Sequence, residues 1–296
     1  GGGARATPAP RGSLSLDPRA AHDEGRSLKA EAFDYLTSDD IRPSPNPSHE
    51  LQRTLRALPN GEWPEVFHTL NAVRRLGLHH GALLEPHLHG VVRDVLKQSE
   101  NLRSAVKKNA ILTLADLWRG LGPTCDPELA LVAPVLIKRV AESNGFLIDT
   151  AEEAIATIVD RATPRRALEA FICCSRSKNP QIRAETAIVV YKLVQRMGNR
   201  LRPNSKEVAK ILEEMPLFLQ DANPKTRTYG RHLLHHLLGA GLATEEELGR
   251  AVPAHVLKKA LASTFAAGGH VGLPPDLGAA PGGGGALPRR TPAAGG

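Results

Sequence analysis

The sequence predicts an all-α protein, an α-solenoid of about six helix pairs stacked side by side. Its middle portion is rich in Leu, Ala, Val and Ile, has few aromatic residues, and places its apolar residues at helical spacing. A short polar motif also occurs twice, as SKNPQIR at 177–183 and as DANPKTR at 221–227. The two Asn-Pro dipeptides are forty-four residues apart, a period that indicates stacked helix pairs rather than one irregular core.

Five amphipathic segments are predicted to be the first helices of these pairs. They span residues 48–58, 85–98, 127–142, 164–175 and 204–220. Helix-breaking stretches bound them, such as PNG at 59–61, GLGPTCDP at 120–127 and GNRLRPN at 198–204. The chain therefore alternates between helices of ordinary length and short turns.

The second helix of each pair follows a polar turn. In the segment SENLRSAVKKNAILTLADLW at 99–118 and just beyond it, apolar residues are spaced by four, four, three and four positions. They are Val106, Ala110, Leu114, Leu117 and Leu121. This spacing places them on one stripe of an α-helix, so the helix is expected to bury one face.

A weaker copy of the repeat lies at 143–160, where the apolar stripe is kept but the turn is acidic, with Asp149, Glu152 and Glu153. Near the end, Thr244 followed by Glu247 predicts a capping box that opens a last short helical segment, through about residue 264. Five pairs and this final segment make an α-solenoid of the HEAT type, in which each pair covers its neighbour's apolar face.

The two ends of the chain have a different composition. Residues 1–45 are predicted to be a disordered tail and linker, residues 46–265 the folded domain, and residues 266–296 a disordered Gly/Pro-rich tail. Gly, Ala, Pro and Arg dominate both ends, and such segments cannot bury enough apolar surface to offset the entropy of ordering. No apolar run reaches the length of a membrane span, and no secretory signal is recognised.

The net charge, the cysteines and histidines, and the catalytic motifs that are absent limit the classes of function that the sequence allows. The formal net charge is +7, which allows an acidic partner without choosing one. Three cysteines, two of them adjacent, favour a reducing compartment, and the His-His pairs at 79–80 and 235–236 do not have the spacing of a metal site. Because no GxSxG, GxxxxGKS/T or HExxH motif occurs, we expect no enzyme activity and no cofactor.

The repeated motif lies between the two helices of a pair, so all its copies are expected on one edge of the stack. Pro180 and Pro224 suit the first position of a helix, and the preceding asparagines suit capping. Basic residues also return in these turns, although they oppose the helix dipole there, so we interpret them as facing an acidic partner. Trp63 lies in the first turn, where it either folds back on the first helix or forms an exposed anchor.

In order and spacing, the turn with Trp63 and the segments LRSAVKKNAILTLADLWRGLG, SKNPQIRAETAIVVYKLV and DANPKTRTYGRHLLHHLL resemble a TOG domain. The resemblance covers residues 46–265 and is to TOG domains of the CLASP and Crescerin (TOG array regulator of axonemal microtubules) group. It implies a flat paddle of six HEAT-like repeats that binds the acidic tubulin heterodimer, or the microtubule lattice, along its intra-repeat loops. The contact residues that it implies are Trp63, Arg103, Ser104, Lys107, Lys178, Asn179, Arg183, Lys225 and Arg227.

The same resemblance implies a cytoplasmic protein of the cytoskeleton, cilium or centrosome, with other microtubule-associated proteins as further partners. Neither a membrane nor a nucleic acid is expected as a partner. The third loop departs from the pattern because Asp149 and the neighbouring glutamates stand where basic or polar contacts are expected. The alternative function is therefore a HEAT-repeat scaffold that binds another protein and not tubulin.

Overall fold

Paired helices run the length of the computed structural model, which describes residues 35–263. The first helices of the pairs are α1 (Pro47–Asn60), α4 (Leu88–Gln98), α6 (Leu129–Val140), α8 (Pro164–Ile172), α10 (Lys206–Gln220) and α12 (Glu245–Ala251). The second helices are α2 (Trp63–His79), α5 (Ser104–Leu121), α7 (Gly145–Arg161), α9 (Pro180–Met197), α11 (Pro224–Gly239) and α13 (Ala254–Ala262). A short helix α3 (Gly81–Leu84) precedes α4. The predicted all-α solenoid is confirmed.

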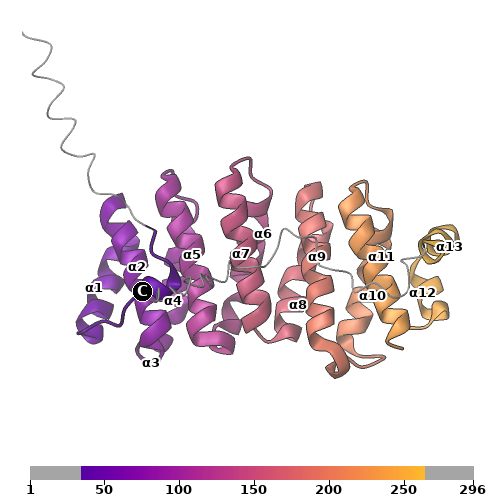
Figure 1. Ribbon diagram of the computed structural model, residues 1–296, viewed down its shortest axis with the longest axis horizontal. Coiled ribbons are helices and arrows are strands. Elements are labelled where there is room, and N and C mark those ends of the chain that lie inside the picture. The colour runs from indigo at the N-terminus through magenta and orange to yellow at the C-terminus, as the bar shows by residue number, and fades with distance from the viewer. Residues whose placement is uncertain (1–34, 264–296) are drawn as a thin grey trace, which may run out of the picture.

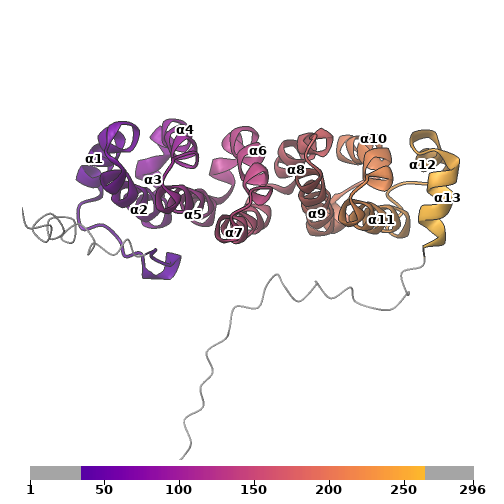
Figure 2. The same ribbon diagram turned by 90° about the horizontal axis from the view of Figure 1, so that it is seen from above.

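The pairs stand side by side in one row (Figure 1). Seen from above, the first helices α1, α4, α6, α8 and α10 form one layer and the second helices α2, α5, α7, α9 and α11 form the other (Figure 2). Apolar residues from both layers fill the space between them in one continuous core. Each pair therefore buries the apolar face that its neighbour leaves open.

Local sequence signals set several helix boundaries as predicted. The predicted break at 59–61 comes later than expected, because α1 continues through Pro59 and ends at Asn60. Pro180 and Pro224 are the first residues of α9 and α11, and the Asn179 and Asn223 side chains cap these helices. Thr244 and Glu247 form the predicted capping box at the start of α12. The last helical segment is divided, however, because the chain is extended at Val252 and Pro253 before α13 begins.

The predicted apolar stripe of α5 lies in the core except for its last member, Leu121, which is partly buried against it. Val106, Ala110, Leu114 and Leu117 are fully buried, as is Trp118. The α5 backbone also approaches α2 closely, since a Cβ atom built on Gly120 would lie 2.2 Å from the carbonyl oxygen of Gly77. This crossing requires glycine at position 120.

The folded part begins earlier than the sequence predicts. Residues 35–45, which were expected to belong to the N-terminal tail, pack beside α2 and α5 on the second-helix side (Figure 2). Ile41 is only 2% exposed, and the Leu36 carbonyl accepts a 2.8 Å hydrogen bond from Nη2 of Arg74. The prediction of a tail is wrong for this segment, because its apolar and backbone groups find partners on two helix pairs. The remaining tail predictions, at 1–34 and 266–296, lie outside the described residues.

The histidine pair at 79–80 has a structural use in holding this segment. His79 Nε2 lies 2.7 Å from the Ile41 carbonyl oxygen, and the Ser44 amide donates to His80 Nε2 at 3.0 Å. Within the described part of the chain, none of the helices combines the length and apolar character that crossing a membrane requires.

Candidate interaction edge

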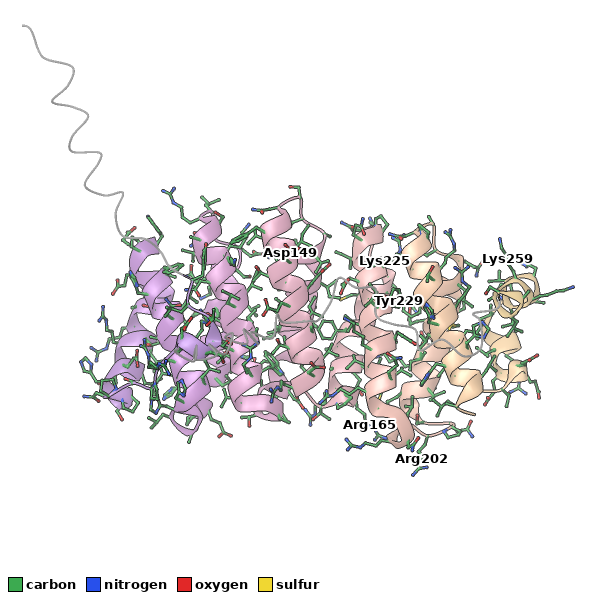
Figure 3. All side chains as sticks on the ribbon, in the orientation of Figure 1. Asp149, Arg165, Arg202, Lys225, Tyr229 and Lys259 are labelled. Atoms are coloured by element: carbon green, nitrogen blue, oxygen red, sulfur yellow. The ribbon has the colours of Figure 1, made fainter. Side chains whose placement is uncertain are left out.

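The loops inside the helix pairs gather along one edge of the row. We define the loop edge as the intra-pair turns of the first five pairs, at 61–62, 99–103, 141–144, 173–179 and 221–223, with the first turns of the helices that follow them. Asp149 and Lys225 lie toward this edge in Figure 3, whereas Arg165 and Arg202 lie at the opposite edge. The predicted common location of the repeated motif is therefore confirmed.

The two copies of the repeated motif have the same internal geometry. Arg183 Nη1 donates to the carbonyl oxygens of Ser177 and Lys178 at 2.9 and 3.1 Å. Arg227 Nη1 makes the equivalent bonds to the carbonyl oxygens of Asp221 and Ala222, at 2.6 and 2.8 Å. We call this arrangement the arginine clamp. It corrects the interpretation that local stability has no use for these arginines, because each of them closes its own turn.

Arg183 also joins the fourth pair to the fifth. Its Nε and Nη2 atoms donate to the two carboxylate oxygens of Asp221 at 2.5 and 3.1 Å. Burial alone would raise the pKa of Asp221, but hydrogen bonds from Arg183 and from the Asn223 amide outweigh burial and hold this pKa below its usual value. Because the Asp221 carboxylate is ionised and accepts hydrogen bonds through both oxygens, it fixes the spacing between the fourth and fifth loops.

The second and third loops are joined by ion pairs. Lys107 Nζ lies 4.0 Å from Glu142 Oε2, and Arg139 bonds both Glu142 and Glu100, the latter at 3.1 Å. Lys138 Nζ is a further 3.6 Å from Glu100 Oε1. The cation of Lys107 is therefore partly engaged within the protein and is less available to a partner than the sequence suggests.

The acidic third repeat has a cation beside it. Lys108 Nζ lies 3.2 Å from the ring centroid of Phe146 and 4.6 Å from that of Tyr35. Burial lowers the pKa of Lys108, and the charges of Glu153 and Asp149 oppose this effect. Part of the negative charge that the sequence places at this repeat is thus compensated by Lys108 from the neighbouring α5.

Trp63 is neither folded back completely on the first helix nor fully exposed as an anchor. It is the first residue of α2, it is half-buried, and its ring packs against the core. The guanidinium carbon of Arg103 lies 5.5 Å from the centroid of the Trp63 ring, within the range of a cation–π contact. Trp63 and Arg103 therefore form one surface unit that spans the first and second loops.

The nine predicted contact residues fall into groups. Arg103, Ser104, Lys178 and Lys225 are exposed at the loop edge, whereas Lys107, Arg183 and Arg227 are half-buried and bonded within the protein. Asn179 is used as a helix cap. Leu102, which is 100% exposed in the second loop, is not among the predicted contacts, although an apolar residue in a polar turn is the same signal that Trp63 gives.

Residues 35–263 contain no group of histidine, cysteine and carboxylate side chains that could hold a metal ion. Burial, aided by the charges of Asp126 and Glu128, raises the pKa of the Cys125 thiol to about 12, and burial raises that of Cys174 to about 11. Both thiols are therefore protonated at neutral pH and are poor nucleophiles.

A sequence profile of the family described as CLASP N terminal matches residues 82–258, which is more than half of the chain. The chain belongs to the CLASP N-terminal family. It is a TOG domain of the CLASP and Crescerin group, as the repeated loops predicted. TOG array regulator of axonemal microtubules protein 1 of Mus musculus is 31% identical over 221 residues, which cover 74% of this chain and 12% of the mouse protein.

Crescerin-like protein che-12 of Caenorhabditis elegans is 27% identical over 212 residues, or 71% of this chain and 16% of that protein. This TOG domain thus spans less than a fifth of the length of either relative. Two solved structures share its fold: the one described as "Crescerin uses a TOG domain array to regulate microtubules in the primary cilium" and the TOG domain from C. elegans Zyg9. Their TM-scores are 0.54 and 0.56, with 16% and 12% identity, and they cover 77% and 82% of this chain and 92% and 93% of their own.

Proposed function

We propose that this TOG domain binds tubulin through its loop edge and acts in the regulation of cytoskeletal or ciliary microtubules. The names of its relatives support this proposal, since the mouse relative is named as a regulator of axonemal microtubules and the Crescerin structure is described as regulating microtubules in the primary cilium. The domain acts as a non-enzymatic binding module in the cytoplasm, and other microtubule-associated proteins are secondary partners.

The single observation that carries the proposal is a set of available cations on one edge. Lys178 and Lys225 are exposed, and no described carboxylate oxygen lies within 4.0 Å of either ammonium nitrogen. Arg103 is also exposed and stacks on Trp63. Cations in such a row steer an acidic partner toward the edge and fix its register.

The arginine clamps support binding indirectly. Because Arg183 and Arg227 hold the fourth and fifth turns in one conformation, little loop entropy is lost when a partner docks against Lys178 and Lys225. In this proposal the clamp arginines position the lysines, while the lysines and the Trp63–Arg103 unit make the contacts. That division of roles refines the list of contacts drawn from the sequence.

Co-migration of the chain with tubulin on a size-exclusion column tests the proposal. We expect the parent chain to associate with tubulin and the variant with Lys178→Glu and Lys225→Glu to lose most of this association, because two attractive charges become repulsive. The matched control carries Arg166→Glu and Arg202→Glu, which make the same charge change at exposed positions outside the loop edge. The control should associate as the parent does.

The alternative is a scaffold that binds a different protein. Its support is the internal pairing of the loop edge, where Lys107, Arg183 and Arg227 are already engaged and Asp149 adds negative charge. Failure of the parent chain to associate with tubulin would favour this scaffold. Equal loss of association in the two double variants would instead contradict the loop edge as the contact surface.

A further inference from the structure

A hollow of about 620 Å³ lies between α11 and α13, at the C-terminal end of the row. Arg227 and Arg231 of α11 line one side, and His255 and Lys259 of α13 line the other. The end of α10 and the fifth loop, with Asp221, complete the wall. We call this feature the α11–α13 hollow. Three of its side chains, Arg231, His255 and Lys259, belong to none of the contacts discussed above.

Helix geometry explains why basic side chains converge there. Arg227 and Arg231 are four residues apart on α11, so they lie on the same face of that helix. His255 and Lys259 have the same spacing on α13, and these two faces lie on opposite sides of the hollow. Figure 3 shows Lys259 on α13, beyond α11 at the end of the row. The positions of these four residues around the hollow are set by the backbones of α11 and α13.

The positive charge in the hollow is not balanced by the residues that line it. Asp221 is the one acidic residue among the described lining residues, and it is only 9% exposed. Its two carboxylate oxygens are already occupied by Arg183 and by the Asn223 amide. No described carboxylate oxygen lies within 4.0 Å of the side-chain nitrogens of Arg227, Arg231 or Lys259.

Arg231 has a buried donor without an acceptor. Its Nη2 atom donates to Thr228 Oγ1 at 3.2 Å, but its Nε atom is buried and has no hydrogen-bond partner. A buried N–H group without an acceptor destabilises the protein, so such a group in a native structure calls for an explanation. A carboxylate that entered the hollow would place negative charge beside the Arg231 guanidinium and the Lys259 ammonium group.

We propose that the α11–α13 hollow binds the carboxylate side chains of an acidic, extended peptide segment, with Arg231 and Lys259 as its principal contacts. The planar guanidinium fork of arginine matches the two oxygens of a carboxylate. No phenylalanine, tyrosine or tryptophan side chain lines the described hollow, so the large rings that usually stack on the bases of single-stranded nucleic acid are absent from it. The inference goes beyond the proposed function, because it concerns recognition of acidic peptide by the domain itself.

Fluorescence anisotropy of a labelled oligoglutamate peptide, titrated with the full chain at low ionic strength, tests this inference. We expect saturable binding that is weakened about tenfold by Lys259→Glu and by Arg231→Gln. Lys258→Glu is the matched control, since it makes the same charge change at the neighbouring exposed position, outside the lining of the hollow. It should leave the affinity within about twofold of the parent.

Three results would overturn the inference. Equal weakening by Lys258→Glu and Lys259→Glu would reduce the effect to net charge, and no weakening by either principal variant would exclude the hollow. An unlabelled oligonucleotide or inorganic phosphate that competed as strongly as unlabelled oligoglutamate would contradict the assignment to acidic peptide. Lys259 is exposed, so Lys259→Glu keeps the test valid even if Arg231→Gln does not fold. Tubulin is absent from the assay, so its outcome does not depend on the proposed function.

Discussion

At the residue scale, the structure gives Arg183 and Arg227 a different role from the one that the sequence indicates. The sequence identifies them as repeated cations at helix starts, where they oppose the helix dipole. The structure offsets that cost with hydrogen bonds to two carbonyl oxygens of the preceding turn, in the same geometry in both repeats. A repeated basic residue is therefore not by itself a sign of an acidic partner, and the exposed Lys178 and Lys225 are the better candidates.

The ion pair of Arg183 with Asp221 predicts a specific dependence of stability on pH. The pKa of Asp221 is lower in the folded protein than in the unfolded chain, so the carboxylate stabilises the fold fully above the unfolded value of about 4. This contribution is lost as the pH falls from there through the folded pKa. We expect Asp221→Asn to lower stability at neutral pH and to weaken the loss of stability on acidification, as measured by urea unfolding at several pH values.

The control for this prediction is Glu246→Gln, which removes a carboxylate from an exposed pair with Arg250. Exposed pairs contribute little to stability, so its unfolding curve should stay close to that of the parent at each pH. An Asp221→Asn variant that kept the full acid sensitivity of the parent would show that other carboxyl groups carry the effect.

At the scale of elements, Gly120 determines how closely α2 and α5 can cross. Gly120 lets the two backbones approach so closely that a Cβ atom there would lie 2.2 Å from Gly77 O and 2.7 Å from Gly77 C. Such contacts are to backbone atoms, which cannot move aside as a flexible side chain can. The helices must separate to accept any side chain at this position.

Gly120→Ala is therefore expected to destabilise the domain by about 1–3 kcal/mol, the usual effect of overpacking. Gly90→Ala is the matched control: it makes the same substitution in α4, where a Cβ atom meets nothing within 4 Å. The control should leave stability unchanged or raise it by up to about 1 kcal/mol, since alanine favours the helix. Denaturant unfolding of both variants checks the pair, and equal effects would contradict the role of the close crossing.

At the scale of the whole molecule, residues 35–45 tie the first two helix pairs together. Behind this segment, Arg74 Nε lies 2.7 Å from Asp116 Oδ2, and both side chains are only 1% exposed. The Leu36 carbonyl accepts from Arg74, and the Ser38 hydroxyl donates to Asp116 at 2.6 Å. A buried ion pair depends on such additional hydrogen bonds, because removal from water is costly for both charges.

A chain that begins at residue 46 should consequently be less stable than one that begins at residue 35. Loss of the Leu36 and Ser38 partners and of buried Ile41 predicts a destabilisation of roughly 2–5 kcal/mol. Denaturant unfolding of the two chains measures this difference. Equal stability would mean that water replaces the segment at no cost.

The sequence by itself determined most of the helices, their pairing, the caps at Asn179 and Asn223, and the single edge on which the intra-pair loops lie. These features depend on spacing within one element or on a repeat along the chain, and both can be read from residue order. The tertiary structure alone decided which cations stay available. Arg183 meets Asp221 and Lys107 meets Glu142 across neighbouring pairs, and Arg231 faces Lys259 across a hollow. These distances cannot be predicted from the periodicity of the sequence, because they are set by how one helix pair packs on the next.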